Sequence, residues 1–106
     1  MTQFVFVYLG GKQPSNPEEA SKHFSKYREW LSSLGESVIS PMIPLKDTST
    51  VSPDGTVREG GSSAMSGFTI IEAVWMEASL AVGQACAFLE IGGSLEVCEL
   101  MQMPAQ

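Results

Sequence analysis

The hydrophobic positions of this chain form strand-length runs separated by helical stripes. The first run covers residues 4–9 (FVFVYL) and ends at two glycines. Six apolar residues rich in aromatic and β-branched types are typical of a strand rather than a helix. Successive side chains of a strand point to opposite faces, so this run has two apolar faces. One face consists of Phe4, Phe6 and Tyr8, and the other of Val5, Val7 and Leu9. Both faces are therefore predicted to be shielded from water.

A helix is predicted over residues 17–34. Asn16 can cap its first turn, Pro17 suits the first helical position, and Glu19 can complete a capping box. Gly35 stands where a residue with positive φ commonly ends a helix. Apolar residues recur at spacings of four and three, which predicts one apolar side facing a sheet. They are Ala20, Phe24, Tyr27, Leu31 and Leu34.

Further strands and a second helix are predicted in the rest of the chain. The strands cover residues 37–40, 67–73 and 94–101, with a hairpin at 48–51 and 56–58. Pro41 and Pro44 disturb the end of the second strand or place it at a sheet edge, and Gly55 supplies the positive φ of the hairpin turn. The second helix, about residues 75–85, lacks a capping side chain and contains Gly83, so it is the weaker helix.

This order of elements predicts an α+β fold. Two β-α-β halves with a hairpin between them are typical of a ferredoxin-like βαββ(β)αβ sandwich, with both helices on one face of an antiparallel sheet. Two helices cover one face only, so the apolar second face is expected to need another subunit. Joining two such faces would close a dimeric α+β barrel. We therefore expect a single homodimeric domain over residues 1–106.

Charge and hydropathy limit the partners. Twelve acidic and six basic residues among 106 give a net charge of −6. Nucleic acids and anionic membranes bind clustered lysines and arginines, whereas these six are spread along the sequence. No apolar stretch approaches the ~20 residues of a membrane span, and the N-terminus lacks the basic region and cleavage site of a signal peptide. We expect a cytoplasmic protein that binds neither nucleic acid nor membrane.

The sulfur-containing and aromatic residues predict packing rather than metal chemistry. Cys86 and Cys98 lack metal-binding or redox spacing, so two reduced, buried thiols are expected. Trp75, Met101 and Met103 are expected in the core or in the dimer seam. One histidine and two separated cysteines fall short of a zinc site, and no serine or cysteine stands in a nucleophile-elbow pattern. No metal and no cofactor is therefore predicted.

Three segments in order span nearly the whole chain and carry a likeness to a known family. They are residues 27–35 (YREWLSSLG), 66–73 (SGFTIIEA) and 86–97 (CAFLEIGGSLEV). In order and spacing they resemble the end of the first helix, the glycine-aromatic strand and the closing segment of YCII-related proteins, which include the DGPF group. The resemblance implies a dimeric α+β barrel. It implies no defined activity, because the biochemistry of that family is poorly defined.

The chain departs from the family pattern at three places. The Asp-Gly-Pro-Phe sequence that names the DGPF group is absent, and residues 58–62 (REGGS) stand near its place. Ala87 replaces the proline usual after the cysteine, and Val74-Trp75 replace the acidic cap usual before the second helix. These departures are typical of a divergent branch. A site that the family builds from these three elements is therefore not expected to carry over unchanged to this chain.

His23 is the only histidine, and histidine ordinarily changes its protonation near neutral pH. It lies one turn before Tyr27 and two before Trp30, at the margin of the helical stripe. A histidine at about this place has been proposed as an active-site residue in YCII-type proteins. The resemblance therefore implies a general acid or base at His23, facing a pocket between helix and sheet. The alternative is a partly exposed helix histidine without a role.

A carboxylate would orient such a histidine. Asp47, after the second strand, is the favoured acid because its loop can fold back over the sheet, with Glu36 and Glu72 as alternatives. Glu72 shares a strand face with Phe68 and Ile70, where its carboxyl would lose solvent; the alternative is a solvated residue at a strand end. The candidate site residues are His23 and Asp47 for catalysis and Tyr27, Trp30 and Glu72 for a ligand pocket.

Residues 60–67 (GGSSAMSG) offer amides and hydroxyls that could cradle an anion. They lack the Gly-Lys-Ser/Thr ending of a phosphate loop and do not lead into a helix. A flexible hairpin connection is therefore expected there.

Two functions from different classes fit the sequence. One is a non-catalytic ligand-binding or regulatory module, favoured by the few acid–base residues and by relatives in the DGPF group that often occur beside sigma-factor genes. The other is a small cofactor-free enzyme of the isomerase, dehalogenase or monooxygenase type, with His23 as acid or base. An enclosed pocket with His23 near a carboxylate would favour the enzyme. A filled core with His23 in solvent would favour the module.

Overall fold

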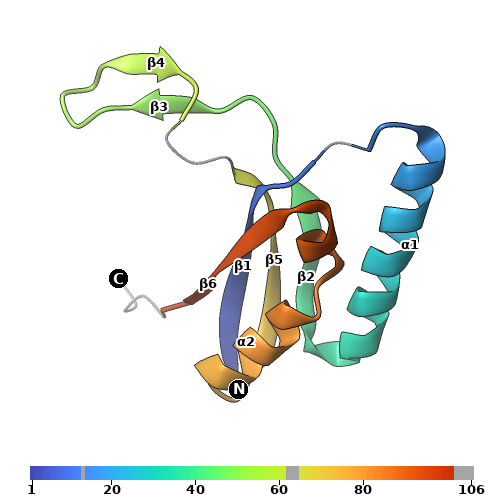
Figure 1. Cartoon of the computed structure of the whole chain (residues 1–106). Coiled ribbons are helices and arrows are strands. Elements are labelled where there is room, and N and C mark those ends of the chain that lie inside the picture. Colours follow the sequence, from blue (N-terminus) through green and yellow to red (C-terminus); the bar gives the residue numbers. More distant parts are fainter. Residues whose placement is uncertain (13, 62–64, 102–106) are drawn as a thin grey trace.

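The computed structural model describes residues 1–12, 14–61 and 65–101. They form an α+β sandwich, in which both helices cover one face of a four-stranded antiparallel sheet (Figure 1). The sheet contains β1 (Thr2–Gly10), β2 (Val38–Pro44), β5 (Met65–Ala73) and β6 (Gly93–Glu99). The other elements are α1 (Pro17–Leu34), η1 (Gly35–Ser37), β3 (Ser49–Val51), β4 (Val57–Glu59), α2 (Met76–Gln84) and η2 (Ala87–Ile91).

The strand order confirms the predicted ferredoxin-like fold. The order is β2-β5-β1-β6, so β5 fills the gap inside the β1-α1-β2 half and β1 fills the gap inside the β5-α2-β6 half. Every neighbouring pair in this sheet is antiparallel. The proline-containing β2 lies at one edge, where a missing backbone donor is tolerated. The short hairpin of β3 and β4 stands apart from this sheet (Figure 1).

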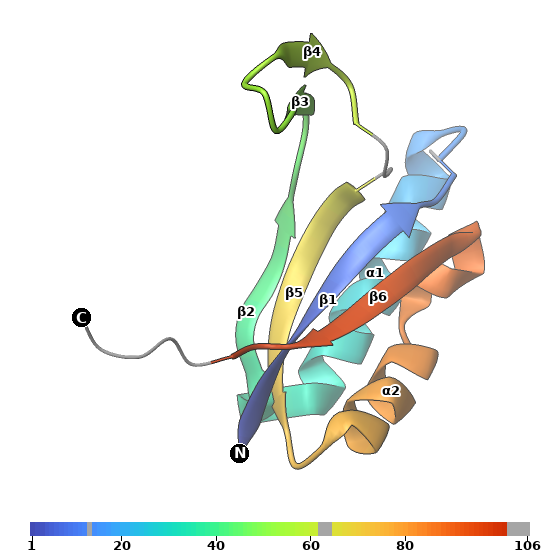
Figure 2. The ribbon, with the colours of Figure 1, turned by 90° about the vertical axis from the view of Figure 1, so that its left-hand side faces the viewer.

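Strand β1 has the two apolar faces that its sequence predicts. Phe4, Phe6 and Tyr8 have no exposed surface and form the centre of the core beneath the helices. The opposite side, which we call the open face, is seen directly in Figure 2, where the sheet lies in front of both helices. The open face consists of Val5, Val7, Leu9, Phe68, Ile70 and Cys98, together with Glu72 and Glu96. No described element of the chain covers it.

The ends of α1 are those that the sequence predicts. The Asn16 Oδ1 atom accepts a hydrogen bond of 2.9 Å from the Glu19 amide, and Gly35 ends the helix with a φ of 55°. The Glu19 carboxylate bonds one residue earlier than a capping box requires. It accepts from the backbone amide of Ser15 at 2.9 Å and from the Ser15 hydroxyl at 2.7 Å.

The buried side of α1 follows the predicted stripe except at Phe24, and it also includes Trp30. Phe24 is 55% exposed, contrary to expectation, while Tyr27 and Trp30 are buried. His23 is half-buried on the same side. Trp30 is buried in place of Phe24 because its indole Nε1 donates a hydrogen bond of 3.0 Å to the Val82 carbonyl. This bond joins α1 to α2. The side facing the sheet therefore takes in His23 and Trp30 beside the partly buried Ala20, Leu31 and Leu34.

Helix α2 approaches the sheet through small residues. Ser79 and Gly83 are buried, and a methyl group at Gly83 would meet Leu95 at 3.4 Å and Phe6 at 3.6 Å. The glycine that lowers helix propensity thus permits close packing on β1 and β6. No side chain caps the start of α2, as the sequence predicts.

Three residues predicted from the sequence to be buried are exposed in the protomer. Trp75 is 61% exposed where β5 turns into α2, and Met101 is 84% exposed, so neither belongs to the core, and their place in the dimer seam stays a prediction. Cys86 is buried as expected, but Cys98 is exposed because it lies on the open face. Met103 lies outside the described residues, as does part of the predicted 60–67 loop, whose last residues, Met65 to Gly67, belong to β5.

Candidate functional site

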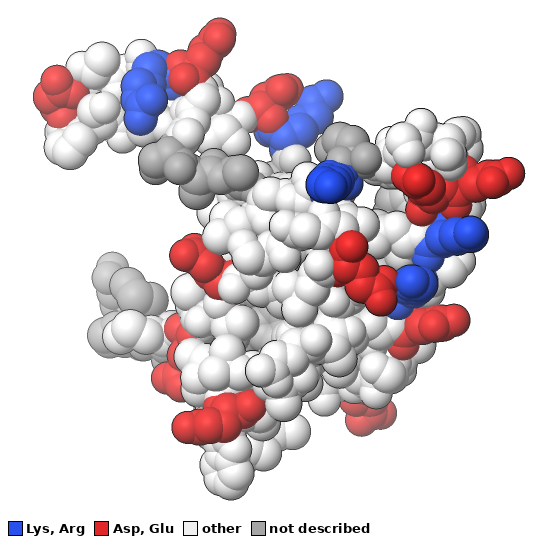
Figure 3. All heavy atoms as spheres, in the orientation of Figure 1, with Lys and Arg blue, Asp and Glu red and all other residues white. Residues whose placement is uncertain are grey.

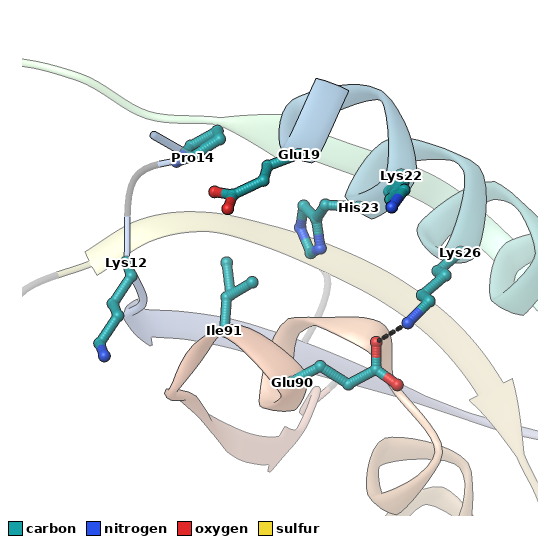
Figure 4. Close-up of a pocket in the computed structure, with 8 residues that line it drawn as sticks. All are labelled: Lys12, Pro14, Glu19, Lys22, His23, Lys26, Glu90 and Ile91. Carbon is teal, nitrogen blue, oxygen red and sulfur yellow. Dashed lines mark ion pairs between the residues drawn. The ribbon is translucent and has the colours of Figure 1, made fainter. Parts of the chain in front are cut away.

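A cavity of about 230 Å³ lies between α1, η2 and the segment after β1 (Figure 4). Its α1 wall carries residues three and four positions apart, which share one side of a helix. The Lys12 amide donates to the Ile91 carbonyl at 2.8 Å and holds the segment after β1 against η2. The lining residues are Lys12, Pro14, Glu19, Lys22, His23, Lys26, Glu90 and Ile91.

His23 faces this cavity. Figure 4 shows its ring pointing into the space between Glu19 and Glu90. Its ring centroid lies 6.3 Å from that of Tyr27 and 6.1 Å from that of Phe24, so one side of the imidazole rests near aromatic surface. Within the described part of the chain, no side chain makes a hydrogen bond to it. The imidazole nitrogens are therefore left to water or to a bound molecule.

The cavity gathers positive charge in an acidic protein. Three of the six basic residues, Lys12, Lys22 and Lys26, line it, although the chain carries a net charge of −6. Lys26 is paired with Glu90, with 3.1 Å between Nζ and Oε2. Among the described residues Lys12 and Lys22 make no ion pair. Figure 3 shows basic and acidic atoms side by side along the α1 side of the molecule. Glu19 and Glu90 also line the cavity, so its three lysines and two glutamates leave a net charge of +1 within a chain of net charge −6.

Glu19 supplies a fixed negative charge one helical turn before His23. Hydrogen bonds from the Ser15 hydroxyl and from the Ser15 backbone amide hold the pKa of the Glu19 carboxyl below its usual range. Glu19 therefore stays ionised at neutral pH, and its carboxylate points into the cavity (Figure 4). Its hydrogen bonds also fix the chain at the entrance of α1.

The structure separates the other predicted site residues. Asp47 is exposed between β2 and β3, with a φ of 59°, and does not line the cavity. Glu36 lies in η1, beyond the opposite end of α1, and Glu72 lies on the open face. Tyr27 and Trp30 are buried beneath α1, on the other side of the sheet from Glu72. The carboxylates brought near His23 are instead Glu19 and Glu90.

Sequence reasoning could have found one of these two acids. Glu19 precedes His23 by four residues on a helix that the sequence predicts well, so their neighbourhood follows from helix geometry. Glu90 reaches the site from η2, a short turn that the sequence pattern does not predict. The described residues contain no group of three or more histidine, cysteine, aspartate or glutamate side chains able to hold a metal ion.

Comparison with solved structures finds a similar fold in a bacterial enzyme. It is 5-chloro-2-hydroxyhydroquinone dehydrochlorinase (TftG) from Burkholderia phenoliruptrix AC1100, solved in complex with 2,5-dihydroxybenzoquinone. The TM-score is 0.60, with 14% sequence identity over 95% of each chain. At this identity the likeness shows a shared α+β fold. No protein-family model and no curated protein matches the chain. No helix in the described residues is long and apolar enough to cross a membrane.

Proposed function

We propose that this protein is a small enzyme that binds an anionic ring compound at His23 and exchanges a proton with it. One observation carries the proposal: the only imidazole of the chain faces a cavity that three lysines line. Support comes from the fold neighbour, which by its name acts on a chlorinated hydroxyhydroquinone and was solved with a hydroxyquinone. A cavity of about 230 Å³ lies just below the usual range of ligand pockets, which suits a single ring.

Each part of the cavity has a role in this proposal. Lys12 and Lys22 attract the acidic oxygens of the ligand, and Ile91 and Pro14 contact its ring. His23 takes a proton from a ring hydroxyl or ring carbon and later returns it or passes it to water. Glu19, ionised and nearby, stabilises the imidazolium formed in between. In an isomerase the proton returns to another ring atom. In a dehalogenase the proton goes to water and the carbon–chlorine bond breaks with loss of chloride, so that a chlorinated hydroxyhydroquinone becomes a hydroxyquinone.

We also propose that the protein is a homodimer joined through the open face, in the cytoplasm, as a divergent YCII-related protein. The open face offers five apolar side chains, from Val5, Val7, Leu9, Phe68 and Ile70, with no described element over them. Burying such a face removes apolar surface from water at about 25 cal/mol per Å². Sedimentation at micromolar concentration should show twice the 11.4 kDa mass.

A second candidate is a binding module without chemistry. The observation in its favour is that no carboxylate in the described residues makes a hydrogen bond to His23. The same cavity would then capture an anionic ligand, and His23 would serve as a contact rather than as an acid or base.

Thermal unfolding with 2,5-dihydroxybenzoquinone tests the binding site. Ligand at about 100 times its dissociation constant stabilises the folded state by about 2.7 kcal/mol, which raises Tm by roughly 10 °C or more in a chain of this length. Lys22→Met should remove most of this shift. Lys46→Met, which removes an exposed lysine outside the cavity, should keep it. An unchanged Tm for the wild-type protein would overturn the proposal.

Chloride release separates the two candidates. The enzyme proposal predicts that the wild-type protein releases chloride and one proton from 5-chloro-2-hydroxyhydroquinone and leaves a hydroxyquinone. His23→Asn should abolish this release while still binding the hydroxyquinone. Binding without any turnover by the wild-type protein would favour the module.

A further inference from the structure

The hairpin of β3 and β4 is an arm that the rest of the protomer does not support. We call residues 48–60 the arm. Its hydrogen bonds are internal: Ser52 donates to Thr56 at 2.8 Å, and Gly60 donates to Thr48 at 2.8 Å. Its ladder pairs Ser49 with Glu59, Thr50 with Arg58 and Val51 with Val57. In the described residues, no hydrogen bond or ion pair joins the arm to the four-stranded sheet.

The arm exposes an apolar pair. Val51 and Val57 stand directly opposite each other, and they are 68% and 66% exposed. A hairpin with three residues in each strand is marginally stable in water by itself, and one cross-strand pair adds only about 0.2–1 kcal/mol. Such an arm is expected to be ordered by a surface that covers its valines.

The arm projects toward the side of the open face. In Figure 1 it extends away from the main sheet on the side opposite the helices. Figure 2 looks onto the open face, and there the arm lies nearer to the viewer than the sheet. Any body that stacks on the open face would therefore lie alongside the arm.

The protomer is extended rather than compact. Its radius of gyration is 15.5 Å, against about 13 Å for a compact chain of this length. Its accessible surface is 7588 Å², against about 5,800 Å² for a compact monomer of 11.4 kDa. The projecting arm contributes to this excess, which is larger than the roughly 800 Å² that each partner buries in a standard interface.

We propose that the arm of each protomer clasps a second copy of the chain, with Val51 and Val57 packed against that copy. The inference rests on the proposed homodimer and adds a second contact region to its open face. A twofold dimer is self-complementary, so both arms make the same contact. The arm is then ordered by the partner, and the dimer gains apolar contacts that the sheet faces alone do not provide.

Sedimentation of arm variants tests the clasp. Val51→Asp/Val57→Asp should raise the dimer dissociation constant about 100-fold, as the loss of two buried valines predicts. Val51→Thr/Val57→Thr, which keeps strand propensity, should weaken the dimer in the same direction. Phe24→Asp is the control, because Phe24 is 55% exposed on α1, on the other side of the sheet from the open face. It should change the constant by less than about threefold.

The outcomes separate the clasp from the dimer itself. A wild-type monomer at micromolar concentration would refute both the homodimer and the clasp. A wild-type dimer whose arm variants bind as tightly as the Phe24→Asp control would leave the homodimer standing and overturn the clasp. Either result is independent of ligand binding at His23.

Hydrogen exchange gives a second readout. Ile70→Glu places a charge on the open face and should yield a monomer. The clasp predicts that the arm amides of Ser52 and Gly55 exchange at least about tenfold faster in that monomer than in the wild-type dimer. Equal protection in both proteins would show that the arm is ordered without a partner, and would overturn the proposal.

Discussion

A ring of three buried hydroxyls holds α1 on the sheet, and its removal has a distinctive energetic signature. The Tyr8 hydroxyl bonds to the Tyr27 hydroxyl and lies 2.6 Å from Thr69 Oγ1, and the Tyr27 hydroxyl lies 3.0 Å from the same Oγ1 atom. Each hydroxyl donates one bond and accepts one, so the ring is complete. Burial raises the pKa values of both tyrosines, so the ring stays neutral.

Tyr27→Phe opens this ring. It removes one hydroxyl and leaves the remaining pair with a buried donor that has no acceptor, which costs about 1–3 kcal/mol. Replacing all three, as in Tyr8→Phe/Tyr27→Phe/Thr69→Val, leaves no unpaired polar atom, and such a replacement can be nearly neutral. The triple variant should therefore lose less stability than the three single variants together, and no more than Tyr27→Phe alone.

Urea unfolding at neutral pH measures these differences as free energies of unfolding. The comparison holds when the slope of the unfolding free energy against urea concentration is the same in all variants. Strict additivity of the three single costs would refute the closed ring, because independent sites add. A Tyr27→Phe variant as stable as the wild-type protein would refute it as well. Because Tyr27 follows His23 by one helical turn, a loosened α1 should also weaken ligand binding in the His23 cavity.

Three further predictions concern single residues. Asn16→Ala should cost about 1 kcal/mol of unfolding free energy, because Asn16 caps α1; no change would mean that the helix begins elsewhere. Gly93→Ala should cost about 1–3 kcal/mol, because the added methyl would lie 2.1 Å from the buried Phe88 ring; a wild-type midpoint in urea would contradict this. Burial raises the pKa of Cys86 from 9.0 to about 11. The unfolded thiol therefore ionises first, so stability should fall as pH rises from 9 to 11, and Cys86→Ala should lessen that fall in unfolding curves measured at each pH.

Much of the fold could be predicted because its signals are local. The alternation of side chains in β1 places Phe4, Phe6 and Tyr8 on the face opposite the open face. These three side chains are the ones of β1 that are buried in the protomer. The cap at Asn16 and the positive φ at Gly35 depend on neighbouring residues only, so the bounds of α1 are readable from the sequence.

What sequence reasoning missed depends on contacts between distant segments. The periodicity of α1 permits a buried Phe24 or a buried Trp30, and the bond from Trp30 to Val82 decides between them. The three lysines of the cavity are spread over α1 and the segment after β1, and Glu90 reaches them from η2. Lys22 and Lys26 share one side of α1 because of their spacing. That Lys12 and Glu90 join them follows from how these elements pack, which residue spacing does not encode.

NMR of the single imidazole tests the central claim most directly. Since His23 is the only histidine, its ring signals are unambiguous as a small acidic hydroxyquinone is added. Anion binding in the cavity predicts a saturable shift of these signals in the wild-type protein and in Lys46→Met, and a much weaker response in Lys22→Met. Imidazole signals that stay unchanged up to millimolar hydroxyquinone, or that move equally in Lys22→Met, would contradict a binding site at His23.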